Sequence, residues 1–71
     1  MNLQYRKWRI LQPTISELAD GSGYSIFNID IAKDIDSATV VRSLWMPGKF
    51  LSKQIACDVA VANCRLFIDQ L

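Results

Sequence analysis

The chain has 71 residues, 51% of them apolar, with eight Lys and Arg against seven Asp and Glu, two Cys and no His. This length fits one small domain over residues 1–71 with a modest core. No apolar stretch approaches the roughly 20 residues of a membrane-spanning helix. Residues 1–10 lack the apolar core and cleavage site of a secretory signal. We therefore expect a cytoplasmic protein that does not enter a membrane.

The first half of the chain has the pattern of a hairpin. Apolar and polar side chains alternate over residues 5–11 and predict a first strand. Pro13 cannot donate to a sheet, so this strand ends, lies on an edge or bends there before residues 14–18 continue the arm. Residues 19–23, Ala-Asp-Gly-Ser-Gly, predict the hairpin loop. Alternation over residues 24–31 then predicts a second strand, with Phe27, Ile29 and Ile31 on one face.

The middle of the chain fits more than one structure. Residues 33–37 are polar and predict a connection between elements. In residues 39–45 the β-branched start favours a strand, whereas the spacing of the apolar residues behind a possible Ser37 cap also fits a helix. We favour the strand. The Pro47-Gly48 pair is expected to end this segment.

One long helix is predicted from Leu51 or Ser52 to Leu71, a stretch without Gly or Pro. The chain is thus expected to be an α+β domain, a three-stranded antiparallel β-meander followed by one long C-terminal helix packed on the sheet (β-β-β-α). The expected core consists of Trp8, Ile10, Phe27, Ile29, Ile55, Val59, Leu66 and Phe67.

The predicted helix is more apolar than one small sheet requires. At 100° per residue, its polar residues fall on one stripe of Gln54, Asp58, Arg65 and Asp69. The remaining surface has one apolar sector with Ile55, Val59, Ala62 and Leu66, and a second with Cys57, Val61, Cys64 and Ile68. We expect the sheet to cover the first sector. A curved sheet, the N-terminal arm or a second copy of the protein would cover the second, and we take Cys57, Val61, Cys64 and Ile68 as the candidate self-association residues.

Side chains that form catalytic or metal sites are scarce. The helix separates Cys57 and Cys64 by about 10 Å along its axis, too far for a disulfide. Without His, neither a zinc site nor an activated thiol is expected, and both thiols are interpreted as core residues. Asp34 and Asp36 are interpreted as solvated turn residues, because they lack the pattern of a calcium loop. We predict no catalytic residue, metal or cofactor.

The basic and aromatic residues near the N-terminus are the candidate nucleic-acid contact. Arg6, Lys7, Trp8 and Arg9 interleave cations with an indole, and Lys49 and Lys53 lie near the predicted helix start. An edge strand protected by solvated cations produces the same alternation. A net charge of +1 gives no broad attraction for phosphates.

Residues 27–31, the later strand and residues 48–56 together resemble the C-terminal half of the double-stranded-RNA-binding domain. In that family a β-β-β-α unit leads through a Gly-containing loop into a helix start of Ser-Lys-Lys-x-Ala-Lys, whose lysines grip phosphates across the major groove. Ser52, Lys53 and Ala56 match this pattern, whereas Gln54 and Cys57 stand at the second and third lysine positions. No helix is expected before the first strand. The resemblance therefore implies the sheet-and-helix architecture more than RNA binding.

These observations predict a non-catalytic binding module. Its predicted role is a protein-interaction adaptor or inhibitor that self-associates, with a second copy or another protein as its partner. The alternative is a nucleic-acid-binding module that uses the basic and aromatic N-terminal strand together with the helix start.

Overall fold

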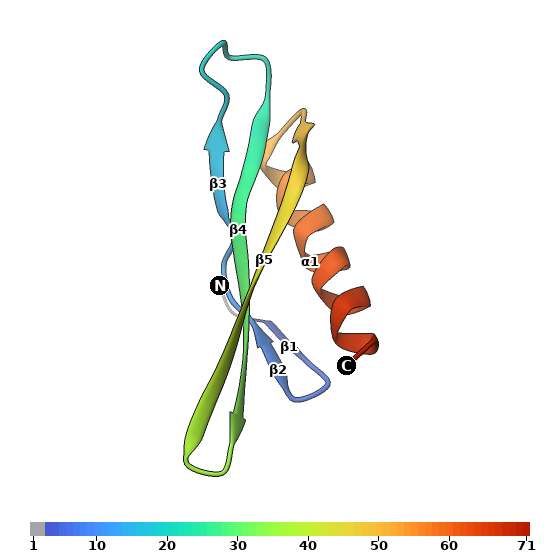
Figure 1. Cartoon of the computed structure of the whole chain (residues 1–71). Helices are drawn as coiled ribbons and strands as arrows, with labels where there is room; N and C mark the ends of the chain where they lie inside the picture. Colours follow the sequence, from blue (N-terminus) through green and yellow to red (C-terminus); the bar gives the residue numbers. More distant parts are fainter. Residues whose placement is uncertain (1–2) are drawn as a thin grey trace.

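The computed structural model describes residues 3–71, which form one antiparallel sheet with a single α-helix on one face (Figure 1). The predicted α+β class, with an antiparallel sheet and a C-terminal helix, is confirmed, but the sheet has five strands instead of three. The elements are β1 (Leu3–Tyr5), β2 (Trp8–Ile10), β3 (Thr14–Glu17), β4 (Tyr24–Ile35), β5 (Ala38–Phe50) and α1 (Lys53–Asp69).

Strand β4 is the centre of the sheet. One of its edges pairs first with β3 and then with β2, in registers that place Ile15 opposite Ile26 and Ile10 opposite Ile31. Pro13 lies between β2 and β3, where the arm bends as its missing N–H predicts. The other edge of β4 pairs with β5 along almost its whole length. The interpretation of residues 39–45 as a strand is confirmed.

Of the two extra strands, one arises where the arm divides at Pro13 into β2 and β3. Two turns that the sequence pattern did not reveal account for the other extra strand and for the longer strands. Residues 5–11 are not one strand, because Arg6 and Lys7 form a tight turn between β1 and β2 with φ of 49° and 69°. Arg and Lys are uncommon at such positive-φ positions, so the pattern gave no warning. Residues 33–37 are mostly strand, since β4 runs to Ile35 and only Asp36 and Ser37 lie between it and β5.

Helix α1 packs against the sheet through its smallest side chains. Ser52 caps the helix, its hydroxyl accepting a hydrogen bond from the Ile55 amide at 3.1 Å. Small residues on the inner face let the helix approach a sheet whose branched isoleucines fill the space between the two layers. The buried helix residues are Ala56, Ala60, Cys64 and Ile68, and they face Trp8, Ile10, Ile26, Ile29 and Ile31.

The expected core is partly confirmed. Trp8, Ile10 and Ile29 are buried as predicted, and Val59 and Phe67 are half-buried. Three further core predictions are wrong, since Phe27, Ile55 and Leu66 are 69%, 46% and 60% exposed. The expected end of the strand at Pro47-Gly48 is also wrong, because β5 continues to Phe50.

Candidate interaction surface

The sheet covers the second apolar sector of α1 and not the first, which corrects the candidate self-association residues. Cys64 and Ile68 are buried under the chain's own sheet, and Cys57 and Val61 are half-buried beside them, so this sector is not a free surface. The prediction assigned the core to the sector with the larger side chains. The sector with the smaller ones packs inward instead, because it allows the closer approach.

The sector of α1 that points to solvent is therefore the one with the larger side chains. Ile55 and Leu66 are exposed and Val59 is half-buried, and Ala62 completes the row. We call Ile55, Val59, Ala62 and Leu66 the helix stripe. An apolar stripe along a solvent-facing helix side is unusual in a monomeric protein.

The contacts of α1 show which side of the molecule the helix stripe faces. The amide of Asn63 lies 3.7 Å from the sulfur of Met46 on β5. On the opposite side, Gln54 and Cys57 line a groove with residues that precede and begin β3. Val59 and Leu66 flank Asn63 on the helix surface, so this part of the stripe lies towards β5, whereas Ile55 and Ala62 lie further round the helix and face away from the sheet.

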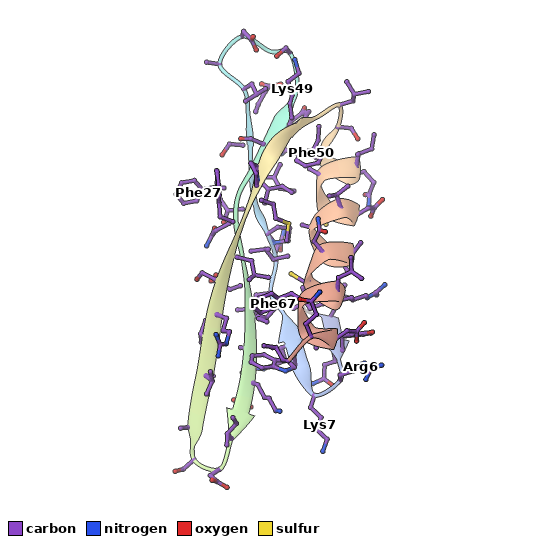
Figure 2. The ribbon with its side chains drawn as sticks, turned by 45° about the vertical axis from the view of Figure 1, so that its right-hand side comes forward. Arg6, Lys7, Phe27, Lys49, Phe50 and Phe67 are labelled. Carbon is purple, nitrogen blue, oxygen red and sulfur yellow. The ribbon has the colours of Figure 1, made fainter. Side chains whose placement is uncertain are left out.

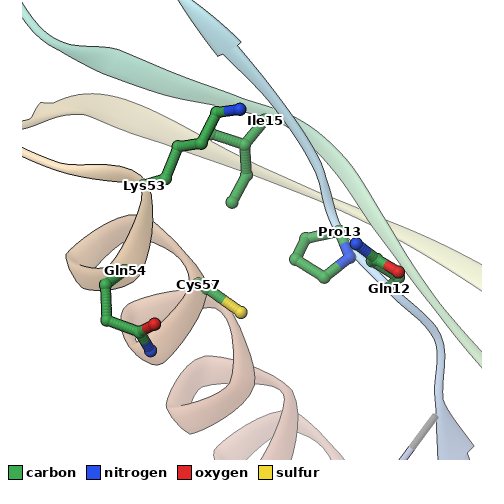
Figure 3. Close-up of a pocket in the computed structure, with 6 residues that line it drawn as sticks. All are labelled: Gln12, Pro13, Ile15, Lys53, Gln54 and Cys57. Carbon is green, nitrogen blue, oxygen red and sulfur yellow. The ribbon is translucent and has the colours of Figure 1, made fainter. Parts of the chain in front are cut away.

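The groove on the other side has a volume of about 250 Å³ and lies between α1 and the segment that joins β2 to β3 (Figure 3). Cys57 and Gln54 line it from the helix, and Pro13 and Ile15 from the opposite wall. Its lining mixes polar and apolar side chains, and Lys53 reaches across its upper end. Its titratable side chains are Lys53, which is exposed, and Cys57, which is half-buried.

Among the strands of residues 3–71, none pairs with the outer edge of β5. The Leu11 amide donates a 2.9 Å hydrogen bond to the Asp30 carbonyl, so Asp30 turns its backbone groups away from β5. Its partner in β5 is Ser43. Because antiparallel pairs alternate, Ser43 and the residues two positions to either side, Val41 and Trp45, turn their N–H and C=O groups to the unpaired edge.

The side chains along this edge are apolar and exposed. Val41 is 55% exposed and Trp45 is 73% exposed on the sheet face opposite α1. Phe27 projects from the same face, away from the helix (Figure 2). Exposed edge strands are usually short or protected by charges or proline, whereas β5 has 13 residues with Arg42 and Lys49 as charged groups and Pro47 near its end. Sequence reasoning missed this edge because strand order is not visible in the pattern.

The candidate nucleic-acid residues do not form one surface. Trp8 is only 7% exposed, so its indole is part of the core and is not available to stack on a base. Arg6 pairs with Asp69 at 2.8 Å and Arg9 pairs with Asp34 at 3.2 Å. Each of these cations is therefore beside a carboxylate that offsets its charge.

The candidate cations lie near opposite ends of α1. Arg6 and Lys7 are at the β1–β2 turn beside the C-terminal end of α1, whereas Lys49 is near the other end of the helix (Figure 2). The 17 residues of α1 separate Lys7 from Lys53 by about 25 Å. Lys49 instead reaches Ser22 in the β3–β4 loop, with its Nζ 3.4 Å from the hydroxyl.

Both thiols are free, and they differ in environment. Burial raises the pKa of the Cys64 thiol to about 11, which keeps it protonated in the core at neutral pH. Cys57 is half-buried in the groove wall. Within residues 3–71, the Cys, Asp and Glu side chains do not gather into a group that could hold a metal ion.

Helix α1, which is the helix of the described chain, is neither long nor apolar enough to cross a membrane. Comparisons of the chain with protein-family models, with curated proteins and with solved structures give no match. The resemblance to the double-stranded-RNA-binding domain stays a prediction.

Proposed function

We propose that this chain is a non-catalytic protein-interaction module, an adaptor or inhibitor that self-associates. The observation that carries the proposal is that a strand edge without a hydrogen-bonding partner within residues 3–71 and an exposed apolar helix surface lie on the same side of the molecule. These are the unpaired edge of β5 and the helix stripe, whose Val59 and Leu66 lie beside Asn63 and so towards β5. A protein partner would satisfy both at once, by extending the sheet and covering the stripe.

The side chains support a protein partner over a nucleic acid. The exposed members of this surface are Val41, Trp45 and Leu66, whereas phosphate binding requires clustered cations. The cytoplasmic location is part of the proposal, because free thiols such as Cys57 and Cys64 are typical of a reducing compartment.

Sedimentation equilibrium over a range of concentrations tests the proposal. We expect a mass that rises with concentration from the 8.0 kDa of one chain towards that of a dimer. Leu66→Glu should weaken association about tenfold or more, because it places a carboxylate in an apolar contact. Gln54→Glu adds the same charge on the other side of α1 and should leave the mass unchanged. A constant mass of one chain at all concentrations would refute self-association.

A further inference from the structure

The β5 strand has a register in which it pairs well with itself. When two copies of β5 pair antiparallel, the numbers of any two residues that lie opposite each other add up to the same value. Since Val41, Ser43 and Trp45 turn their backbone groups outward, these residues must meet one another across the new edge. A two-fold axis at Ser43 achieves this, because it sets Val41 opposite Trp45 of the second copy and Ser43 opposite itself.

Charge and backbone chemistry disfavour the neighbouring registers. A two-fold axis at Arg42 would set two guanidinium groups directly opposite each other, and like charges in that position are destabilising. An axis at Leu44 would set Val41 opposite Pro47, which has no N–H to donate, inside the new ladder. With the axis at Ser43, Pro47 lies opposite Thr39, near the end of the new ladder, where the missing N–H interrupts fewer pairs. With the axis at Ser43, Arg42 faces Leu44, and the exposed Val41 and Trp45 form an aromatic and β-branched pair of the kind that stabilises antiparallel strands.

The same axis brings the helix stripes of two copies together. Leu66 follows Asn63 by about 4.5 Å along α1, which runs antiparallel to β5 (Figure 1). Because Asn63 lies beside Met46, Leu66 is level with Leu44 or Trp45 and so lies close to the axis at Ser43. Helix α1 packs over β4, with β5 on one side and β2 and β3 on the other, so the two helix axes would lie about 14 Å apart. This is wider than the usual spacing of packed helices, and long side chains such as Leu66 would reach into the gap from both sides.

A stable dimer needs only a fraction of the surface of this chain. A standard interface takes about 800 Å² from each partner, about a sixth of the 4918 Å² of this chain. The 13-residue edge of β5 is about 40 Å long, and the adjoining side of α1 adds about 25 Å of apolar helix surface.

We infer that the partner of this surface is a second copy of the chain, paired antiparallel through β5 about a two-fold axis at Ser43, with Val59 and Leu66 of the two helix stripes facing each other. The inference rests on the proposed self-association and specifies its geometry. The dimer is a continuous ten-stranded sheet with both helices on one face.

Cysteine cross-linking tests this geometry in the full chain with Cys57→Ser. We expect Ser43→Cys to form a covalent dimer on mild oxidation at concentrations where sedimentation shows dimers, because opposite Cα atoms lie about 5.5 Å apart. The matched control Thr39→Cys, on the same edge, places its thiols about 26 Å apart and should stay uncross-linked. Adding Leu66→Glu to the Ser43→Cys chain should abolish the cross-link.

The outcomes separate the inference from the proposed function. Dimers in sedimentation without a cross-link at position 43, or with equal cross-linking at positions 39 and 43, would overturn the β5 register and leave self-association standing. Chains that sediment only as monomers would overturn both. Circular dichroism on each variant confirms that the fold is intact before the result is read.

Discussion

Ile26 and Ile29 are both buried beneath α1, although an odd number of positions separates them in the same strand. A β-bulge between them makes this possible, since β4 advances from Ile26 to Ile29 while β5 advances only from Met46 to Leu44. The extra residue reverses the alternation of side chains. As a result, Phe27 points to solvent on the face opposite the helix (Figure 2).

This bulge predicts that substitutions at two nearby apolar positions change the free energy of unfolding by very different amounts. Phe27→Ser should change the free energy of unfolding by about 0.5 kcal/mol or less, because it removes an exposed side chain. Ile29→Ala should lower it by about 3 kcal/mol, since it leaves a cavity in the core. Urea denaturation of the two variants measures both effects. Equal losses would mean that Phe27 is a core residue and that the bulge is wrongly placed.

The bulge also shows why the sequence predicted the positions of strands and helix better than it predicted which side chains point into the core. Hydrophobic alternation and the Gly-rich loop at residues 19–23 located the hairpin of β3 and β4, and a stretch free of Gly and Pro located α1. Alternation cannot reveal an inserted residue, so Phe27 was assigned to the wrong face.

The helix faces illustrate a second limit of the pattern. Two apolar sectors of α1 were visible in the sequence, but their hydrophobicity did not decide which packs inward. The decision depends on the gap between layers, and small residues such as Ala56 and Ala60 allow a closer fit against bulky isoleucines. The candidate surface was missed for a related reason, since the strand order that leaves β5 on an edge depends on pairings distant in the sequence.

Close backbone packing at Gly23 predicts a selective effect of alanine. A Cβ at position 23 would lie 2.6 Å from the Phe50 carbonyl oxygen, a backbone atom that cannot move without disturbing β5. Gly23→Ala should therefore lower the free energy of unfolding by about 1–3 kcal/mol. Gly21→Ala meets no atom within 4 Å, and its φ of 73° costs about 1 kcal/mol. Thermal denaturation should rank Gly23→Ala as the less stable; the reverse order would contradict the close approach.

The buried thiol predicts a loss of stability at alkaline pH. Burial raises the pKa of Cys64 from 9.0 to about 11, so between these values the unfolded chain ionises its thiol while the folded chain does not. The contribution is fully present below pH 9 and is lost as the pH rises through 11, by about 3 kcal/mol in all. Comparing the chain with Cys64→Ala by urea denaturation at pH 8 and pH 10.5 isolates this effect. Identical pH dependence in both proteins would show that Cys64 is not buried in the fold.

The direction of the backbone groups in β5 predicts which positions tolerate proline. Ser43→Pro removes an N–H that faces the unpaired edge, so the hairpin with β4 should remain folded while association is lost. Leu44→Pro removes an N–H that faces β4 and should lower the free energy of unfolding by about 3 kcal/mol or more. Circular dichroism and sedimentation measure the two consequences. A Ser43→Pro chain that unfolds like Leu44→Pro would mean that Ser43 faces β4.

The most direct test of self-association through β5 is amide hydrogen exchange, followed residue by residue as the protein concentration increases. The amides of Val41, Ser43 and Trp45 face the unpaired edge in one chain and donate to the second copy in the dimer. We predict that their exchange slows as concentration rises, while Arg42 and Leu44, which bond to β4, are protected throughout. Exchange at Val41, Ser43 and Trp45 that stays fast at every concentration would contradict the account.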